Sequence, residues 1–356
     1  MSLIGSELVR LDDTEEVATR IGAFFDERVT MASAHGRQYR SLWEAARQAS
    51  EGGKRFRPAL VLDTYRELGG CDAGDAVRVA TAFELLHTAF LLHDDVIDRD
   101  TVRRGRPNLV GAFAADAADR GASEEDAELW GQASAILAGD LLIYSAQAMV
   151  ARLSVAERKR SSLLDLLDQC VFVTAAGELA DVAFSTRVET PELSDVLAMT
   201  AWKTATYSFE GPLKAGAILA DAGADDLRTL GEFGGLVGVA FQLRDDILGV
   251  FGIEHLTGKS AISDIRGGKI TPLVVYAQRT SHGAELNHIL ARAELCDTDG
   301  DIVRGILEQS GARAFVEEMI NDYADRAIEL IRSSGLPSGL RSRLHGVAQH
   351  AIERVA

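Results

Sequence analysis

The chain has 356 residues, of which 47% are hydrophobic, so it is long enough to bury a large core as one domain or two. Its formal net charge of −17 at pH 7 argues against a general nucleic-acid-binding protein, because affinity for backbone phosphates requires clustered positive charge. Local basic clusters could still bind small polyanions.

The three cysteines, Cys71, Cys170 and Cys296, follow no metal-binding spacing and are odd in number. They are typical of reduced thiols, and together with the acidic N-terminal segment they predict a cytoplasmic protein. No apolar run reaches the roughly 18 residues that a membrane-spanning helix needs, so no membrane span is expected. The 6 prolines are few, and the abundance of Ala, Leu, Glu and Arg favours an all-α fold.

Amphipathic helices are predicted first, over residues 5–34 and 37–50. The segment that follows, EGGKRFRP at 51–58, places a glycine pair before three cations. Cations at the start of a helix oppose the helix dipole unless an anion joins them. A phosphate site is therefore favoured, and a basic helix N-terminus after a loop is the alternative interpretation.

A helix over residues 58–69 is predicted next, and a longer apolar helix begins near residue 74. The longer helix ends in three carboxylates, Asp94, Asp95 and Asp98, which four arginines follow. Asp94 and Asp98 fall one turn apart on the same helical face. Unit charges about 4 Å apart repel by roughly 4 kcal/mol at an effective dielectric near 20, and hard oxygen ligands suit Mg²⁺. The alternative interpretation is a solvated acidic helix end with weak surface ion pairs.

Residues 114–130 are acidic and rich in small residues, which predicts an exposed loop or insertion without chemistry. Long apolar helices are expected on its C-terminal side, over residues 132–150 and 161–184.

Glu178 and Asp181 fall on one face of the second long helix. An isolated acidic pair at this spacing is interpreted as a solvated face. Two helices are predicted over residues 192–220, around Lys203, which taken alone is typical of a surface lysine.

A second acidic pair, Asp245 and Asp246, interrupts an apolar helix predicted over residues 226–252. Two such pairs, far apart in the chain, predict opposing walls of one cleft around a metal–phosphate cluster, because Mg²⁺ uses few carboxylates plus substrate phosphates. The TGKS that follows at 257–260 is not a P-loop, since Ile253 stands where that motif needs glycine. Further helices are expected over residues 270–356.

Taken together, these pieces resemble the trans-isoprenyl diphosphate synthases, the polyprenyl synthetase family. The matching segments occur in the family's order within residues 52–269: GKRFRP at 53–58, LHDDVID at 92–98, RRG at 103–105, KT at 203–204, FQLRDD at 241–246 and the stretch 259–269. The resemblance implies a single all-α domain over residues 1–356, with the isoprenoid synthase fold, helices surrounding a central active-site cavity, and a homodimer.

The resemblance also implies a role for each matched residue. The implied metal ligands, for typically three Mg²⁺ ions, are Asp94, Asp95, Asp98, Asp245, Asp246 and Asp264. The implied contacts of an allylic diphosphate are Arg103, Lys203, Thr204, Gln242, Lys259 and Lys269. Those of isopentenyl diphosphate are Gly53, Lys54, Arg57, His87 and Arg104. The implied catalytic set is the five aspartates of the two motifs together with Lys203.

The implied reaction is a Mg-dependent head-to-tail (1′-4) condensation of isopentenyl diphosphate with allylic diphosphates. One departure from the family pattern is Gly249, which stands where many relatives have a third Asp in the second motif. Activity is expected to survive, because Asp245 can still bridge to metal.

Product length is expected to depend on the residues beneath Asp94. Phe90 lies one turn below it and Ala89 is its small neighbour, and relatives use bulk at these positions to stop chain growth. The pair favours geranylgeranyl diphosphate as product, and farnesyl or longer polyprenyl diphosphates are the alternatives.

Two rival functions share part of this pattern. A class I terpene cyclase also ionises an allylic diphosphate, but it needs no second diphosphate site such as Gly53, Lys54 and Arg57 imply. A non-catalytic partner subunit is expected to have lost aspartates of the first motif, and all three are present.

Overall fold

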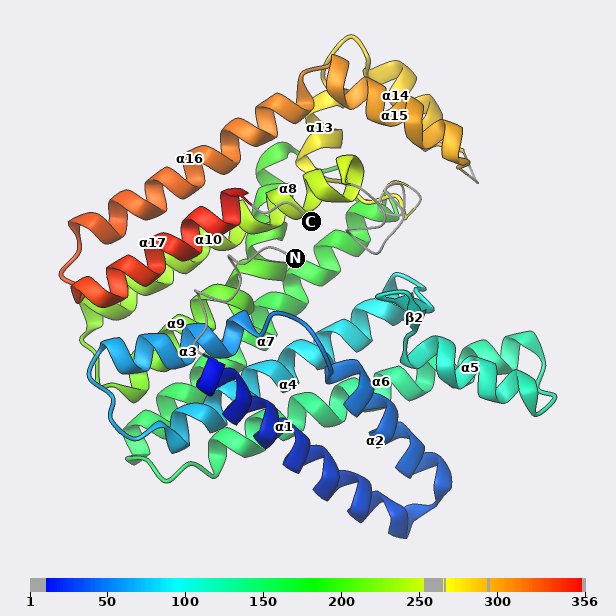
Figure 1. Ribbon diagram of the computed structural model, residues 1–356. Coiled ribbons are helices and arrows are strands. Elements are labelled where there is room, and N and C mark those ends of the chain that lie inside the picture. The colour runs from blue at the N-terminus through cyan, green and yellow to red at the C-terminus, as the bar shows by residue number, and fades with distance from the viewer. Residues whose placement is uncertain (1–10, 253–264, 266, 293–294, 354–356) are drawn as a thin grey trace. The chain divides into compact units, whose positions relative to one another are not determined.

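The structure is a computed structural model that describes residues 11–252, 265, 267–292 and 295–353. Within these residues the chain is almost entirely helical, which confirms the predicted all-α fold (Figure 1). The chain forms two compact units, one from Met1–Leu167 with Pro212–Gly223 and the other from Asp168–Gly211 with Ala224–Ala356. The single domain expected from the sequence stays a prediction, and each unit is described by itself.

The first unit contains the N-terminal helices and a short hairpin. Its elements are α1 (Leu11–Ala32), the 3₁₀ turn η2 (Ser33–His35), α2 (Arg37–Ser50), α3 (Phe56–Glu67), α4 (Ala73–Ile97), β1 (Val102–Arg103), β2 (Arg106–Pro107), α5 (Leu109–Asp119), α6 (Glu124–Ala151) and, from Pro212, α9 (Gly211–Leu219). Helix α7 (Glu157–Ser185) contributes its first residues to this unit and the remainder to the second.

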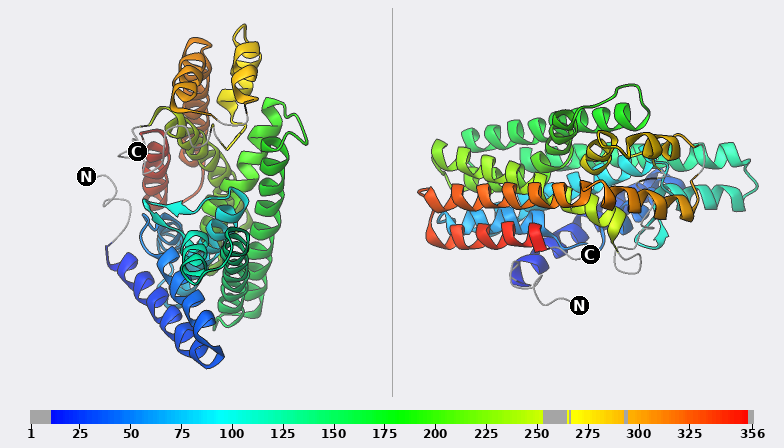
Figure 2. Two further views of the ribbon diagram at one scale, coloured as in Figure 1. Left: turned by 90° about the vertical axis from the view of Figure 1, so that its right-hand side faces the viewer. Right: turned by 90° about the horizontal axis from the view of Figure 1, so that it is seen from above.

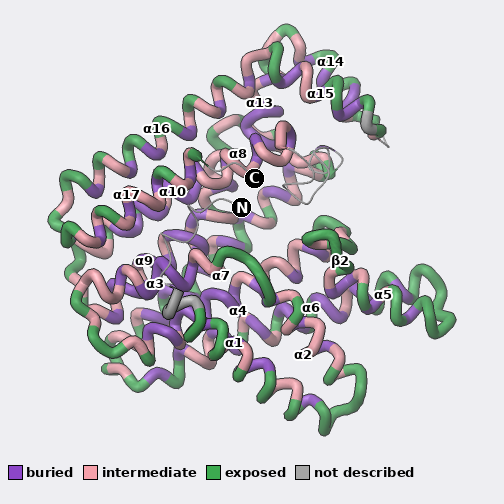
Figure 3. Tube along the Cα trace, viewed as in Figure 1, coloured by how far each residue is buried: buried purple, intermediate pink, exposed green. Residues whose placement is uncertain are grey.

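Helix α4 is the centre of the first unit. It packs against α1, α2, α3 and α6, and most of its residues are buried (Figure 3). Helix α4 carries apolar side chains around its whole circumference, and its own Phe83, Leu85 and Leu92 are almost fully buried. A helix that is apolar all round belongs in a core, so the acidic end of α4 is held by one of the most buried elements of its unit.

Most of the interval 114–130 is helical, so the expected loop is wrong, while the alternative of an insertion stays a prediction. Helix α5 extends to Asp119 and α6 begins at Glu124. Ser123 caps α6 by accepting a hydrogen bond from the Asp126 backbone N–H at 3.1 Å, and the acidic first turn complements the helix dipole. The alanines and acids that suggested a loop are good helix formers at a helix start.

The second unit is built on α10 (Ala224–Phe251). Its other elements are α8 (Leu193–Thr200), the π-helix η3 (Ala201–Glu210), α13 (Pro272–Gln278), α14 (Gly283–Leu290), α15 (Asp297–Gln309), α16 (Ala312–Ser333) and α17 (Ser338–Glu353). Helix α10 packs against η3, α16 and α17, and α16 and α17 lie side by side (Figures 1 and 2). Phe233 and Leu230 of α10 are completely buried.

The expected helix pair over residues 192–220 has an additional feature, since the ten residues of η3 form a π-helix between α8 and α9. Such wide turns are uncommon and are frequent at functional sites.

One helix of the described residues, α6, is long and apolar enough to cross a membrane by length and composition alone, with 44% of its most apolar window buried. Core helices pass the same test, so this is weak evidence for a membrane span.

Candidate active site

The end of α4 presents the first acidic motif. Asp95 is buried, with 2% of its surface exposed, whereas Asp94 is partly buried and Asp98 is exposed. Asp98 is the C-cap of the helix, and its N–H donates to the Asp94 carbonyl at 2.8 Å. The three carboxylates therefore differ in solvent access although they occupy one helical turn.

Arg103 is a cation that pairs with two carboxylates of this motif, Asp94 and Asp95. The hairpin of β1 and β2 pairs Arg103 with Arg106, and its turn residues Arg104 and Gly105 both have positive φ, which folds the chain back toward α4. The Arg103 guanidinium lies 2.6 Å from Asp95 and 3.2 Å from Asp94. Its Nε also donates to Asp95 at 2.8 Å. The predicted acid–base neighbourhood is therefore a partly buried ion-pair cluster.

The same contacts shift the pKa of both partners. Burial raises the pKa of the Asp95 carboxyl above its ordinary value, and the charge of Arg103 offsets only part of this. Burial acts to lower the pKa of Arg103, but the neighbouring Asp95 and Asp94 raise it overall. A buried carboxylate of this kind requires a cation beside it to stay ionised.

Arg104 covers the glycine pair that the sequence associates with isopentenyl diphosphate. Its Nη1 donates to the Glu51 carbonyl at 2.8 Å. A Cβ atom added to Gly52 would lie 2.8 Å from Arg104 Nη1, and one added to Gly53 would lie 3.3 Å from Nη2. Both glycines have positive φ. Glycine is favoured here because residues with a side chain rarely adopt these positive φ values, whereas the arginine side chain could move aside.

His87 lies among the cations of the same region. Burial, and then the guanidiniums of Arg57, Arg103, Arg104 and Arg55, hold the pKa of His87 well below its usual range. The imidazole is therefore neutral at pH 7 and can accept or donate a hydrogen bond without adding charge.

Lys54 and Arg57 belong to the same glycine-rich segment. Arg57 is buried in the first turn of α3, with its guanidinium 4.5 Å from the centre of the Phe56 ring, and Lys54 is exposed. The first unit thus brings together the residues that the sequence assigned to isopentenyl diphosphate.

The two residues expected to limit product length differ in accessibility. Ala89 is completely buried and Phe90 is partly accessible. Of this pair, only the aromatic side chain is accessible, and its role in limiting product length stays a prediction.

In the second unit, Lys203 of η3 is a partner of two carboxylates on α7. Its ammonium lies 2.6 Å from Asp181 and 3.1 Å from Glu178. The interpretation of Glu178 and Asp181 as a solvated pair is wrong, since Asp181 is buried and both contact the lysine. A Cβ atom on Gly177 would lie 2.3 Å from the Lys203 backbone nitrogen, so this glycine permits the close approach of α7 and η3.

The second acidic motif is connected to η3 by hydrogen bonds. Thr204 Oγ1 donates to Gln242 Oε1 at 3.0 Å, and Gln242 Nε2 donates to Asp246 Oδ1 at 3.0 Å. Asp246 is buried, and Asp245 and Gly249 are partly accessible on α10. Gln242 therefore positions Asp246 in this structure. Lys269 is partly accessible, whereas Lys259 and Asp264 lie outside the described residues.

Carboxylate oxygens beside cations are the donor set that Mg²⁺ prefers. In the part of the chain that the structure describes, no group of three His, Cys, Asp or Glu side chains forms a preassembled metal site. An incomplete protein shell fits an ion that keeps several waters and uses substrate phosphates as ligands. The presence of Arg103 against Asp94 and Asp95 shows that this carboxylate pair already recruits a cation.

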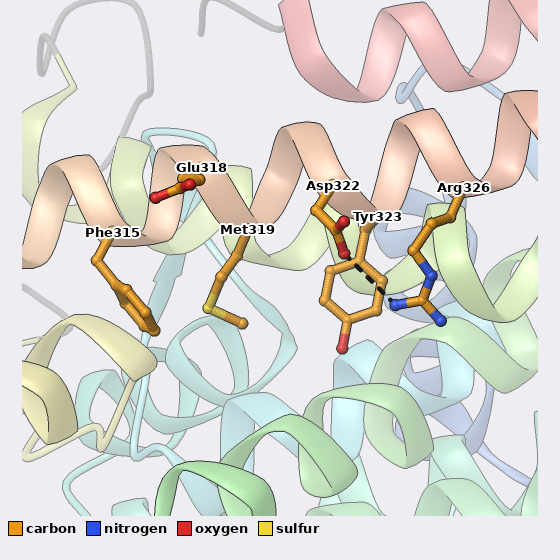
Figure 4. A pocket seen from close by; sticks show the side chains of 6 residues that line it. All are labelled: Phe315, Glu318, Met319, Asp322, Tyr323 and Arg326. Atoms are coloured by element: carbon orange, nitrogen blue, oxygen red, sulfur yellow. Dashed lines mark hydrogen bonds and ion pairs between the residues drawn. The ribbon is translucent and has the colours of Figure 1, made fainter.

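A hollow of about 350 Å³ lies along one face of α16 (Figure 4). It is lined by Phe315, Glu318, Met319, Asp322, Tyr323 and Arg326. None of the site residues predicted from the sequence lines it. We assign it no chemistry, because its lining comes from a single helix.

Sequence reasoning passed over two sets of residues that the structure brings together. Glu178 and Asp181 meet Lys203, and Arg55 forms an ion pair with Glu84 at 2.6 Å. The sequence held one signal for each set: an acid pair at helical spacing, and a third cation in the glycine-rich segment. Neither signal indicates which residue the side chain contacts.

Comparison with known proteins gives a consistent result. The family model of polyprenyl synthetase matches residues 40–307. Geranylfarnesyl diphosphate synthase of Aeropyrum pernix is 32% identical over 309 residues, covering 85% of this chain and 91% of that protein. Geranylgeranyl diphosphate synthase of Methanosarcina mazei is 29% identical over 320 residues, covering 90% of each. The crystal structure of geranylgeranyl pyrophosphate synthase from Corynebacterium glutamicum, complexed with isoprenyl diphosphate and magnesium, has a TM-score of 0.89 at 26% identity and covers 96% of this chain and 98% of that one.

Proposed function

Because this chain belongs to the polyprenyl synthetase family, we propose that it is a prenyltransferase that condenses isopentenyl diphosphate with an allylic diphosphate to give a short-chain all-trans prenyl diphosphate. The relatives named above make geranylgeranyl or geranylfarnesyl diphosphate, which supports this product class.

The observation that carries the proposal is the cluster at the end of α4. A buried carboxylate and its neighbour on α4 share one guanidinium, that of Arg103, while Arg104 of the same hairpin turns to the glycine pair. Carboxylates for a metal ion thus stand beside arginines for two different diphosphates.

Magnesium fits the proposed site through the two acidic motifs. Asp94, Asp95 and Asp98 would hold it in the first motif, and Asp245 and Asp246 in the second. When bound, the ion would neutralise the charge that develops on the departing diphosphate. The number of ions, expected to be three, and the role of Asp264 stay predictions.

The chain's own residues then have separate tasks. Arg103 and Lys203 bind the allylic diphosphate and stabilise the negative charge released when the carbon–oxygen bond of the allylic substrate breaks. Thr204 and Gln242 orient Asp246. Lys54, Arg57 and the neutral His87 bind isopentenyl diphosphate, whose alkene attacks the allylic carbon. A proton then passes to the departing diphosphate, which leaves as the other product.

We propose geranylgeranyl diphosphate as the main product. Phe90 is the partly accessible residue of the pair beneath Asp94, and its ring would block further growth of the chain. Farnesyl and longer products are the alternatives, since relatives in this family include farnesyl and geranylfarnesyl diphosphate synthases.

A homodimer is supported by the outer face of α6. Large apolar side chains are exposed at helical spacing along it, namely Leu129, Ile136, Leu137 and Tyr144. Such a stripe is typical of an interface, and we propose that a second copy of the chain covers it. A cytoplasmic location is also proposed, from the cysteine usage.

A product assay tests the function. Purified protein, Mg²⁺ and isopentenyl diphosphate are incubated with dimethylallyl, geranyl or farnesyl diphosphate in turn, and product lengths are read by chromatography. A dominant C20 product is expected, and a C30 or longer product would refute the role of Phe90. If no starter is condensed by the folded protein, the terpene cyclase and the partner subunit become the better proposals.

A further inference from the structure

The loop between α2 and α3 is held by an arginine that is not among the residues assigned above to either substrate. Arg55 is the N-cap of α3 and adopts the left-handed conformation, with φ of 51° and ψ of 33°. A non-glycine residue in this conformation is strained and persists only where its surroundings hold it.

The surroundings of Arg55 are two acceptors in fixed positions. One guanidinium nitrogen lies 2.6 Å from the Glu84 carboxylate on α4, and another donates to the Ser50 carbonyl at 2.7 Å. The side chains of Arg55 and Glu84 are only 13% and 8% exposed. A charge-assisted contact in such surroundings is stronger than one at the surface.

Arg104 approaches the same helix end from the hairpin. It donates to the Glu51 carbonyl, one residue after the Ser50 carbonyl that Arg55 binds. Both carbonyls belong to the C-terminal end of α2, where the helix dipole favours cations. Arg55 thus binds the last carbonyl of α2, and Arg104 binds the next carbonyl and lies against Gly52 and Gly53.

Glu84 connects this loop to the rest of the isopentenyl site. It precedes His87 by three residues on α4, which places the two on neighbouring positions of one face. One guanidinium nitrogen of Arg55 donates to Glu84 and another donates to the Ser50 carbonyl, so its side chain is held in place from both sides of the loop. Lys54 and Arg57 of the same segment are the cations that the proposed function assigns to isopentenyl diphosphate.

We propose that Arg55 and Glu84 are positioning residues of the isopentenyl diphosphate site. Their buried ion pair ties the strained start of α3 to α4, and so sets the positions of Lys54 and Arg57 relative to His87. This inference rests on the proposed function, and it concerns mainly one of the two diphosphate sites, because Arg55 pairs with Glu84 whereas Arg103 pairs with Asp94 and Asp95.

The test is a pair of Michaelis constants for Arg55→Lys, Arg55→Met and Glu84→Gln. We expect the KM for isopentenyl diphosphate to rise about tenfold in Arg55→Met and Glu84→Gln, equal to about 1.4 kcal/mol. In Arg55→Lys, which keeps the charge but loses the fork, the rise should be smaller. The KM for the allylic diphosphate should change less than about twofold, which is close to the usual effect of a distant substitution.

The exposed pair Arg40 and Glu44 provides the matched control, with the same residue types 2.8 Å apart and side chains 54% and 44% exposed. Arg40→Met and Glu44→Gln should leave both Michaelis constants unchanged. Thermal midpoints of all variants show whether each is folded, and Arg55→Lys serves if Arg55→Met fails to fold.

The outcomes separate the two hypotheses. Failure of the wild-type protein to condense any starter overturns the proposed function. An active wild type whose Arg55 and Glu84 variants keep the normal KM for isopentenyl diphosphate overturns the positioning role. Equal rises in both Michaelis constants, with a lowered thermal midpoint, also overturn it, since they indicate a general loss of structure.

Discussion

Glycines of α10 allow the π-helix η3 to approach closely, and substitution of one of them tests this packing. A Cβ atom on Gly238 would lie 2.4 Å from Ala205 Cβ and 2.5 Å from Ala205 Cα. Gly235, on the same helix, would place its Cβ 3.5 Å from the flexible Glu210 carboxylate, an ordinary contact. Gly238→Ala and Gly235→Ala are therefore the same substitution in the same helix with opposite expectations.

The magnitudes follow from two opposing effects. Replacement of a helical glycine by alanine contributes up to about 1 kcal/mol of stability at either position. Overpacking against Ala205, which belongs to backbone that cannot rotate away, costs about 1–3 kcal/mol. We expect Gly235→Ala to be stabilising and Gly238→Ala to be less stable than it by about 2 kcal/mol, or roughly 3 °C in thermal midpoint for a chain of this length.

Activity provides the second measurement. Movement of η3 displaces Lys203 and Thr204, so Gly238→Ala should also raise the KM for the allylic diphosphate, while Gly235→Ala should not. The assay is thermal unfolding of the purified variants together with steady-state kinetics. If Gly238→Ala matches Gly235→Ala in both midpoint and KM, the close packing of η3 on α10 does not govern the site.

Three other predictions concern single side chains. Lys203→Met removes the ammonium that contacts Glu178 and Asp181, so the free energy of unfolding should fall by about 1–3 kcal/mol. An additional Asp181→Asn substitution should recover part of that loss. Denaturant titration of the single and double variants measures both effects. His87 has a folded pKa below its ordinary 6.5, so the unfolded chain binds more protons and stability should fall as the pH drops below about 6.5, by at most about 1.4 kcal/mol per pH unit. His87→Gln should remove that part of the slope in midpoints measured against pH, and an unchanged slope would assign it to other groups. Phe90→Ala should lengthen the product in the chromatographic assay, and an unaltered distribution would exclude Phe90 as the stop.

Much of the fold could be predicted from the chain alone. The helices at 37–50, 58–69 and 226–252 were expected within a few residues of α2, α3 and α10, because apolar spacing and glycine pairs are local signals. The loop expected at 114–130 failed for the opposite reason, since small and acidic residues are equally compatible with a capped helix start. No local signal in the sequence distinguishes the π-helix η3 from an α-helix, and glycines of α7 and α10, distant in sequence, allow these helices to approach it closely.

The candidate site divides in the same way. The acidic motif and the arginines after it are close in sequence, so their association could be predicted from spacing. The structure added that the hairpin folds Arg103 back onto Asp94 and Asp95. Residues distant in sequence could not be paired in this manner. Glu178 was expected in solvent because its partner Lys203 lies on another helix, 25 residues later.

By itself the sequence therefore determined the helical fold, the two acidic motifs and the family, since each depends on residue types at short, regular spacing. Only the tertiary structure decided which charges are neutralised within the protein. Arg55 lies in a short segment of cations, yet its partner Glu84 lies 29 residues away in the chain. A helix presents a face at a spacing that the sequence defines, but the partner of that face depends on how the helices pack, and packing is a property of the whole core.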